Sequence, residues 1–482
     1  MRGMVRILGL AALSAAAAGG ATAQVEGPAV ASPASFPAVA RGLDPYADPP
    51  AYPSTYRELQ APPTAIINAV ILTAAGPRID GGTVLMREGR IEAVGRDFAV
   101  PTDARIIDAA GRWVTPGIID PHAHIGAGSS PGAAGGDSSN ESGPNPGGVW
   151  VEHSVWPQDP MFERALAAGV VTMQILPGSS NMFNGRTVVL RNVEALSPQA
   201  MKFPDARQGL KMACGENPSS GGAGKPGTRA GAMMGYRNTF IAAAAYAARW
   251  DAYRRKTEAG ERADPPGRDL TLETVAGALK GDIPVHIHCY RADEMLQMID
   301  LSHEFGFRIA AFHHALEAFK IAPELVREGV PVVTLAGDWS GYKMEAYDSI
   351  MENAAFIEAA GGVAALHSDD VMLMQHLNHE AGRAMTAGRE AGLQTTPEQA
   401  IRWITLNPAR VLGLDDRTGS LEPGKIADVI VWSADPFSVY SAPDLVFMDG
   451  AQVHDRAASA AAPRSDFELG HVRRPDVAEA PR

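Results

Sequence analysis

Cysteine is scarce in this chain, which has only Cys214 and Cys289 among its 482 residues. A chain of this length with one possible pair is not a disulfide scaffold. Its hydrophobic content of 45% is enough to bury a large core without cross-links. The fold must therefore be stabilised mainly by packing.

An excess of positive charge is also missing. The chain has 42 Lys and Arg against 55 Asp and Glu, for a formal net charge of −13. Nucleic-acid binding domains usually have a basic stripe or patch, which this sequence lacks. We therefore expect no nucleic-acid partner and look for a small-molecule substrate.

Long apolar runs are absent as well, apart from one near the start. The run from Ile7 to about Ala18 is shorter than the roughly 20 residues that span a bilayer. It follows Arg2 and Arg6, and small residues at 21–23 precede Gln24, which is the pattern of a cleavable signal peptide over 1–23. We predict cleavage near Ala23 and a periplasmic or secreted protein with no membrane contact afterwards; an uncleaved anchor is the alternative.

The remaining chain changes composition several times. Residues 24–63 are rich in Ala and Pro and are predicted to form a linker, and 456–482 a loosely ordered tail. Short strand-like runs separated by Gly and Asp turns fill 64–115. Two more, KIADVIVW and DLVFMDG, fall in 414–455. Together these segments predict one composite β-sandwich domain.

Between these segments, over 116–413, apolar β-branched runs alternate with helical patterns. Repeated βα units indicate a parallel sheet, and their spacing fits a (β/α)₈ TIM-type barrel of roughly 250 residues. An open doubly wound sheet is the alternative. The predicted strands are GIIDPHAHI, VVTMQIL, the weaker TVVLRNV, LKMACG, IPVHIHC, RIAAFHH, VPVVTLAG and VAALHSD.

Metal-ligand residue types occur where these strands end. His122 and His124, two positions apart, share one strand face and can reach one metal ion. His288, His314 and Asp369 each end or follow another predicted strand. Barrel enzymes build their sites at the carboxyl ends of the strands, so this convergence favours a metal site over hydrogen-bonded core histidines.

These motifs resemble the amidohydrolase superfamily over residues 64 to 450. The similarity rests on TPGIIDPHAHIG, two strand-ending histidines, HSDD, and the segment LNPARVLGLDDRTGSLEPGKIADVIVW. The closing segment is the most specific part, because it combines a helix with NPA, a Gly-rich turn and a GKxAD strand. The resemblance implies a barrel hydrolase of the imidazolonepropionase-like or dipeptidase-like branch.

The resemblance also implies roles for the strand-ending residues. It assigns His122 and His124 to a first metal ion, His288 and His314 to strands five and six, and Asp369 to strand eight as ligand and proton acceptor. Such mixed ligation with an open position suits Zn²⁺ or a similar divalent ion, which can lower the pKa of bound water to about 7. One or two ions per chain are both consistent with this ligand set.

A bridging ligand is needed if two ions bind, and the family uses a carboxylated lysine or a glutamate there. The fourth predicted strand reads LKMACGENP. We expect Glu216, at its carboxyl end, to be the bridge, because strict alternation puts Lys211 on the opposite face. The same alternation puts Cys214 on the face of Glu216 and Cys289 out of phase with His288, so no disulfide is expected.

Other polar residues lie near the strand ends but are not assigned to the metal. His286 is expected one layer deeper than His288, and His313 is expected to face the helices. Arg291 is a candidate for binding a substrate carboxylate, or else an exposed arginine at a helix start. Three residues after strand eight could line the pocket but are expected to be solvated helix residues: Asp370, His376 and His379.

The predicted function is metal-dependent hydrolysis of an amide-type C–N bond in a peptide, N-acyl amino acid or cyclic amide. Asp369 is expected to take a proton from the metal-activated nucleophile. A mononuclear deaminase on the same fold is one alternative, and a non-catalytic binding protein another. A homo-oligomer is compatible with the sequence.

Overall fold

The computed structural model describes residues 41–45, 52–128, 139–140, 143, 145–220 and 225–461. The chain divides into two compact units, Met1–Ala47 and Asp48–Arg482. Within the first unit the described part is a single 3-10 turn, η1 (Arg41–Leu43). The predicted signal peptide, 1–23, lies outside the described residues.

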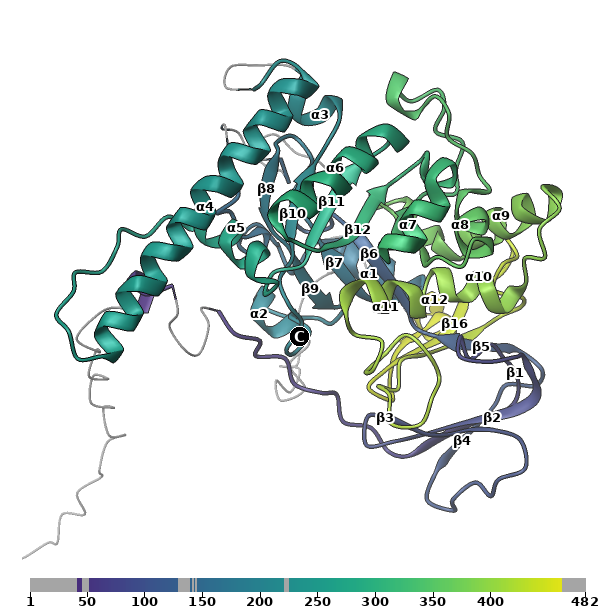
Figure 1. Cartoon of the computed structure of the whole chain (residues 1–482). Coiled ribbons are helices and arrows are strands. Elements are labelled where there is room, and N and C mark those ends of the chain that lie inside the picture. Colours follow the sequence, from purple (N-terminus) through teal and green to yellow (C-terminus); the bar gives the residue numbers. More distant parts are fainter. Residues whose placement is uncertain are drawn as a thin grey trace, which may run out of the picture. The chain divides into compact units, whose positions relative to one another are not determined.

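A β-domain combines strands from before and after the barrel (Figure 1). Its sheet has the order β17-β16-β15-β5-β1-β2-β3, and β4 pairs with β1. β15 is antiparallel to β5, with Val429 opposite Pro116, so a late strand completes the early ones as predicted. The strands are β1 (Thr64–Ile71), β2 (Ile79–Arg87), β3 (Arg90–Gly95), β4 (Arg105–Asp108), β5 (Trp113–Pro116), β15 (Val429–Trp432), β16 (Pro443–Met448) and β17 (Ala451–Asp455).

The barrel strands are short and almost fully buried, as expected where helices cover a sheet from outside and side chains fill its interior. Each one coincides with a run predicted from the sequence, except the strand over 183–186, which was not predicted. They are β6 (Ile118–Ala123), β7 (Val170–Ile175), β8 (Phe183–Arg186), β9 (Val188–Arg191), β10 (Leu210–Ala213), β11 (Val285–Cys289), β12 (Ile309–His314), β13 (Val332–Thr334) and β14 (Ala364–Leu366).

These strands form the predicted (β/α)₈ TIM-type barrel. Hydrogen bonds give the orders β14-β13-β12-β11-β10-β8 and β6-β7-β9. Only Thr187 separates β8 from β9, so the two together occupy the third position. The N–H of Asp369, after β14, donates to the carbonyl oxygen of His122 on β6 (3.1 Å) and joins the last strand to the first. The third position differs from the expected pattern, because β9 is antiparallel to β7 and β8 is antiparallel to β10.

Helices follow most of the barrel strands, and α6 packs against β12 (Figure 1). Left-handed glycines, which lack the steric penalty of a Cβ, end four of them: Gly281, Gly306, Gly329 and Gly413. The helices are α1 (Pro160–Ala167), α2 (Pro198–Met201), α3 (Glu216–Ser219), α4 (Arg229–Glu258), α5 (Leu270–Lys280), α6 (Ala292–Phe305), α7 (Ala322–Glu328), α8 (Asn353–Ala359), α9 (Leu377–Glu390), α10 (Pro397–Trp403), α11 (Leu406–Leu412) and α12 (Arg456–Ala461). Short 3-10 turns are η2 (Val151–His153), η3 (Ala318–Ile321), η4 (Met344–Ala346) and η5 (Leu373–His376).

A buried charge network joins the barrel to the β-domain. Arg191, at the end of β9, donates to both carboxylate oxygens of Asp428 (2.6 and 2.8 Å) and to Asp449 (3.0 Å). The hydroxyl of Tyr56 donates to Asp449 from the segment that precedes β1. Asp428 is the aspartate of the GKxAD motif. This motif therefore has a structural role, because its aspartate pairs with a buried guanidinium between the β-domain sheet and the barrel.

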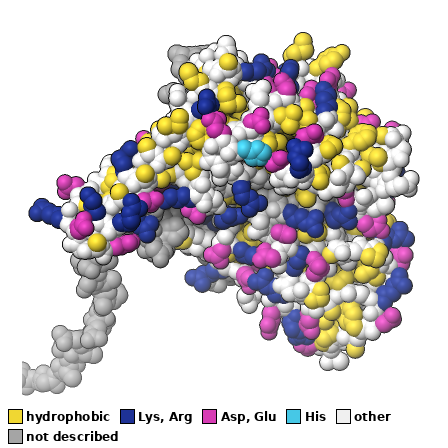
Figure 2. All heavy atoms as spheres, viewed as in Figure 1, with side chains coloured by type: hydrophobic (Ala, Val, Ile, Leu, Met, Phe, Trp, Pro, Cys, Tyr) yellow, Lys and Arg dark blue, Asp and Glu magenta, His cyan; other side chains and the backbone are white. Residues whose placement is uncertain are grey.

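The surface has charges of both signs. Lys and Arg lie among Asp and Glu over the face shown in Figure 2, without a continuous basic stripe on that face. No helix among the described residues is long and apolar enough to cross a membrane.

Candidate metal centre

Three of the predicted ligands meet where the first and last barrel strands end. Asp369 Oδ1 lies 3.3 Å from His122 Nε2 and 3.4 Å from His124 Nε2. His124 is oriented through its other ring nitrogen, Nδ1, which lies 2.8 Å from the carbonyl oxygen of Leu176. The ring of His122 is fully buried, whereas the carboxylate of Asp369 is half-buried. These three side chains form one side of a possible cation site.

The loop after β14 is fixed to β6 by a buried carboxylate. Asp120 accepts hydrogen bonds from the Ser368 hydroxyl (2.5 Å) and from the N–H groups of Ser368 (3.3 Å) and His122 (3.1 Å). Burial raises the pKa of Asp120 to about 7, against the effect of these hydrogen bonds. Asp120 thus positions two ligand-bearing segments relative to each other.

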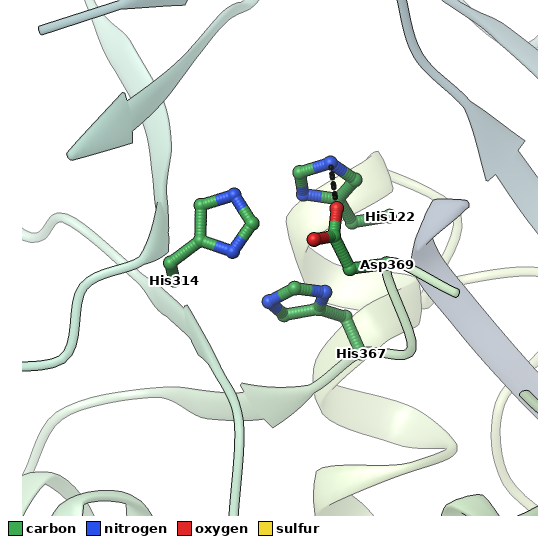
Figure 3. Close-up of side chains that lie close together, drawn as sticks. All are labelled: His122, His314, His367 and Asp369. Atoms are coloured by element: carbon green, nitrogen blue, oxygen red, sulfur yellow. Dashed lines mark ion pairs between the residues drawn. The ribbon is translucent and has the colours of Figure 1, made fainter. Parts of the chain in front are cut away.

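His314 and His367 complete a group in which one ligand atom from each residue lies within 4.8 Å of all the others; its members are His122, His314, His367 and Asp369. Figure 3 shows these side chains around one shared space. His314 and Asp369 have φ of 64° and 60°, in the left-handed region that non-glycine residues seldom adopt. Such backbone strain costs about 1–3 kcal/mol per residue and is typical of functional sites.

His288 lies beside this group from the neighbouring strand β11. Its ring centroid is 4.5 Å from that of His314 and 4.8 Å from that of Tyr290. The structure thus brings His122, His124, His288, His314 and Asp369 together at the carboxyl ends of β6, β11, β12 and β14. His367 was not singled out from the sequence, although it precedes Asp369 by two residues, the same spacing that identified His122 and His124.

The chemistry of these side chains fits divalent metal ions. Five fully buried ring nitrogens have no hydrogen-bond partner among the described residues: both of His288, both of His367, and Nδ1 of His314. Burial lowers the pKa of His122, His288 and His314 well below the ordinary histidine value, and that of His367 to about 4. Neutral imidazoles with free lone pairs are metal ligands, and a bound cation would remove the cost of leaving them unpaired.

Asp369 is ionised in this setting. Burial opposes the charge, but the neighbouring imidazoles of His314 and His124 outweigh it and hold the pKa of Asp369 well below its usual range. An ionised carboxylate beside the imidazoles can bind a cation and can also accept a proton.

Lys211 enters the same group from β10. Its Nζ lies 3.2 Å from His122 Nε2, and its side chain is fully buried. Burial lowers the pKa of Lys211 to about 7, although Asp369 opposes this shift. The expectation that Lys211 points away from the barrel interior is therefore wrong.

Glu216 lies elsewhere. At the start of α3, its carboxylate is 3.1 Å from Lys343 Nζ, and its backbone N–H donates to the carboxylate of Glu345 in η4. It is outside the group of converging ligand atoms. This geometry favours Lys211 over Glu216 as the bridging residue, which is the reverse of our expectation. The reason is that the side chain of Lys211 points from β10 into the barrel interior.

The orientation of alternate side chains on β10 also explains why the two cysteines can pair. Cys214 and Cys289 form a disulfide, with Cα atoms 5.2 Å apart, so the expectation of no bond is wrong. In the ladder between β10 and β11, Lys211 pairs with His286 and Ala213 with His288. Odd-numbered residues of β10 therefore share the interior face, and Cys214 points outward, as Cys289 does on β11.

His313 also differs from expectation, because it faces the interior and not the helices. Its Nδ1 lies 3.0 Å from Nδ1 of His122, and His288 is its register partner on β11. Two successive histidines reach the site because the positive φ of His314 interrupts the alternation of β12. His286 lies in the layer below His288, as expected, in contact with His313.

The structure places Arg291 as the N-cap of α6, where its guanidinium pairs with Asp293 (2.9 Å) and is half exposed. Asp370 accepts hydrogen bonds from the N–H groups of Met372 and Leu373, and His376 stacks on His379. None of these residues lines the cavity over the metal ligands.

That cavity has a volume of about 500 Å³ and opens above His124, His288, His314 and Asp369. Its other walls are polar. Lys225 donates from Nζ to the carbonyl oxygens of Ser180 (2.7 Å) and Asn217 (3.0 Å). The remaining lining residues are Ser139, Asn140, Gly178, Ser179, Ser220, Tyr290 and Tyr342. Sequence reasoning missed these wall residues, which come from loops with no periodic pattern.

Comparisons with known proteins agree with this geometry. The model of the Amidohydrolase family matches residues 258–455. Amidohydrolase tasK from Hapsidospora irregularis is 31% identical over 421 residues, 82% of this chain, although the chain spans only 42% of that relative's length. Imidazolonepropionase from Caulobacter vibrioides is 27% identical over 407 residues, 77% of this chain and 93% of the relative.

A solved structure, an amidohydrolase from Thermotoga maritima MSB8, shares both sequence and fold. It has 33% sequence identity and a TM-score of 0.73, and the alignment covers 82% of this chain and 100% of that one. The chain therefore belongs to the amidohydrolase family of metal-dependent hydrolases, as its strand-ending ligands and GKxAD segment predicted.

Proposed function

We propose that this protein hydrolyses an amide-type C–N bond in a small polar substrate, with two divalent metal ions held at the carboxyl ends of the barrel strands. The observation that supports this most directly is the set of buried ring nitrogens around Asp369, beneath a polar cavity, that have no hydrogen-bond partner in the described part of the chain. Such a set is costly unless cations bind there.

His122, His124 and Asp369 would hold one ion, and His288 and His314 the other, with His367 beside them. Lys211 is the proposed bridge, as a carbamate formed with carbon dioxide. Its lowered pKa supports this, because the neutral amine is the form that reacts. A bound divalent ion polarises a carbonyl and lowers the pKa of water, with Zn²⁺ as the first choice.

Asp369 is the proposed general base. Its carboxylate is ionised, reaches the cavity and lies between the two imidazoles of the HxH pair. It would accept a proton from the attacking water and return it to the leaving nitrogen.

The cavity walls favour a substrate with a polar or anionic end. Lys225 contributes a cation, and Tyr290 and Tyr342 contribute hydroxyl groups. A peptide or an N-acyl amino acid has both the scissile bond and such an end, and a cyclic amide that bears a carboxylate does too. The relatives named imidazolonepropionase add imidazolonepropionate to the compounds that should be tested.

The test is hydrolysis of dipeptides, N-acyl amino acids, lactams and imidazolonepropionate by metal-loaded protein. Asp369→Asn protein prepared in parallel is the matched control, and metal content is measured on the same samples. Amide cleavage with about two ions per chain is expected. Ammonia release from an aminated ring, with full activity at one ion per chain, would instead establish a deaminase.

Lys211 and Glu216 make separable contributions under this proposal. Lys211→Ala should lower the metal content toward one ion per chain, since the bridge is lost. Glu216→Gln should retain both ions, because the wild-type Glu216 carboxylate forms an ion pair with Lys343 and does not face the metal site. Elemental analysis of the two purified variants measures this, and the opposite pattern would restore Glu216 as the bridge.

We also propose that the protein is exported to the periplasm or secreted. The Arg-flanked apolar run over 1–23 supports this, and so does the Cys214–Cys289 disulfide, since such bonds persist in oxidising compartments. Cell fractionation combined with N-terminal sequencing of the mature protein tests it, and a cytosolic protein starting at Met1 would contradict it.

A further inference from the structure

A row of buried polar side chains continues from His122 into the barrel, away from the cavity. His122 Nδ1 lies 3.0 Å from His313 Nδ1, and His313 Nε2 lies 2.9 Å from His286 Nδ1. His286 Nε2 is in turn 3.3 Å from the side-chain amide of Gln174. We name these four residues the histidine relay. All four are at most 1% exposed, so bulk water does not replace these contacts.

A neutral imidazole has one protonated and one free nitrogen, so the direction of one hydrogen bond in the relay sets the others. His122 turns Nε2 toward Asp369 and Lys211. If that atom binds a metal ion, His122 must donate from Nδ1 to His313, and His313 must donate from Nε2 to His286. His286 then carries its proton on Nε2 and needs an acceptor at Gln174.

We propose that Gln174 is a positioning residue whose side-chain oxygen accepts from His286 and thereby fixes the metal-binding tautomer of His122. This inference rests on the proposed metal site. If the Gln174 amide instead donated to His286, every hydrogen bond of the relay would be reversed. His122 would then carry its proton on Nε2, where it would prevent a cation from binding. The amide orientation at the far end of the relay therefore selects between a metal-binding and a protonated His122.

The surroundings of Gln174 also allow the accepting orientation, with the same number of hydrogen bonds from the amide. With the amide nitrogen toward His286 and Thr187, the oxygen Oε1 is buried without a hydrogen-bond partner among the described residues. A half turn of the amide gives Oε1 two donors, His286 Nε2 and the Thr187 hydroxyl, whose oxygen already accepts from the N–H of Gly209 (2.8 Å). The amide N–H groups then take the place of Oε1 as the unpaired buried atoms, so the tautomer of His286 decides between the two orientations.

Close packing holds the relay in one geometry. A Cβ at position 209 would lie 2.6 Å from Cδ2 of His286, so glycine is needed beside this ring. Hydrogen-bonded partners that orient metal-binding histidines contribute about 10–100-fold to metal affinity. Gln174 acts through two further rings, so an effect at the lower end of this range is expected.

The experiment measures Zn²⁺ affinity at one fixed pH by competition with a chromogenic chelator, together with thermal unfolding of each variant. Gln174→Leu should weaken binding about 10-fold, His313→Phe about 100-fold, and Gln174→Glu should restore near wild-type affinity because an acceptor oxygen returns. Asn192→Leu is the control, since it removes a buried amide that donates to the backbone carbonyl oxygens of Phe162 (3.0 Å) and Val170 (2.8 Å), away from the relay. It should lower stability and leave affinity unchanged.

Nitrogen-15 NMR of histidine-labelled, Zn²⁺-loaded protein reports the tautomers directly. We expect His122 protonated at Nδ1 and His313 and His286 at Nε2, with assignments from the variants. His286 protonated at Nδ1, or Gln174→Leu with wild-type affinity, would overturn the proposal, as would a loss in Gln174→Leu that Gln174→Glu does not restore. Wild-type protein that binds no metal would instead contradict the proposed function, so the two failures are distinguishable.

Discussion

Arg191→Met is a severe test of how the barrel and the β-domain are joined. The guanidinium is 1% exposed and pairs with two carboxylates, Asp428 and Asp449, which are 3% and 2% exposed. Methionine has similar length and no charge, so the variant leaves two buried carboxylates without a cation. Breaking a buried ion pair in this way costs about 3–5 kcal/mol, and we expect the free energy of unfolding to fall by that amount at pH 7.

The loss should depend on pH. In the variant, burial and the charge of Asp428 both raise the pKa of Asp449, and no guanidinium opposes them. A carboxyl whose pKa is higher in the folded state costs no stability below its unfolded pKa, and the cost grows as the pH rises. The difference from wild type should therefore shrink from pH 7 to pH 5, by up to about 1.4 kcal/mol per pH unit.

Urea unfolding followed by tryptophan fluorescence at pH 5, 6 and 7 measures both effects. Adding Asp449→Asn to Arg191→Met should recover part of the loss, because one buried charge disappears. Arg237→Met, which removes an exposed pair with Glu304, is the control and should change little. A loss below about 1 kcal/mol, or one independent of pH, would refute the argument that this network is a buried charge pair.

Three further predictions concern the site and its support. His122→Ala combined with His124→Ala should abolish tight metal binding and activity together, because two ring nitrogens facing Asp369 are lost; normal metal content by elemental analysis would contradict this. Asp369→Asn should keep the fold and lose about 10²-fold or more in turnover, as expected for a general base, and wild-type rates across the pH range would exclude that role. Replacing Cys214 and Cys289 by serine removes a cross-link over 75 residues and should lower stability by about 4 kcal/mol, measured by urea unfolding; an unchanged midpoint would show that the bond contributes nothing.

The barrel was predictable because its strands, except β8, are short apolar runs that end near a polar or catalytic residue type. Buried parallel strands are apolar on both faces, so such runs mark them clearly. The direction of the third strand was not predictable. A buried run such as TVVLRNV pairs equally well in either direction, and the connection of one residue between β8 and β9 has no distinctive pattern.

The ligands were predictable to the extent that they end strands. His122, His124, His288, His314 and Asp369 were found in this way, and all five converge in the structure. His313 was misplaced, because the positive φ of His314 lets two successive side chains point into one site. Backbone conformation of this kind is imposed by tertiary packing, and local sequence does not encode it.

The errors on the fourth strand have a single cause, and the sequence contained the means to correct it. Alternation relates the residues of a strand to one another but leaves open which set faces the interior. A phase inferred from Glu216 is wrong because Glu216 lies beyond the end of β10, where alternation no longer applies. The signal peptide predicted an oxidising compartment, in which the only two cysteines are expected to pair. Since Cys289 is out of phase with His288, a bond to it requires Cys214 to point outward, and then Lys211 must point toward the metal ligands.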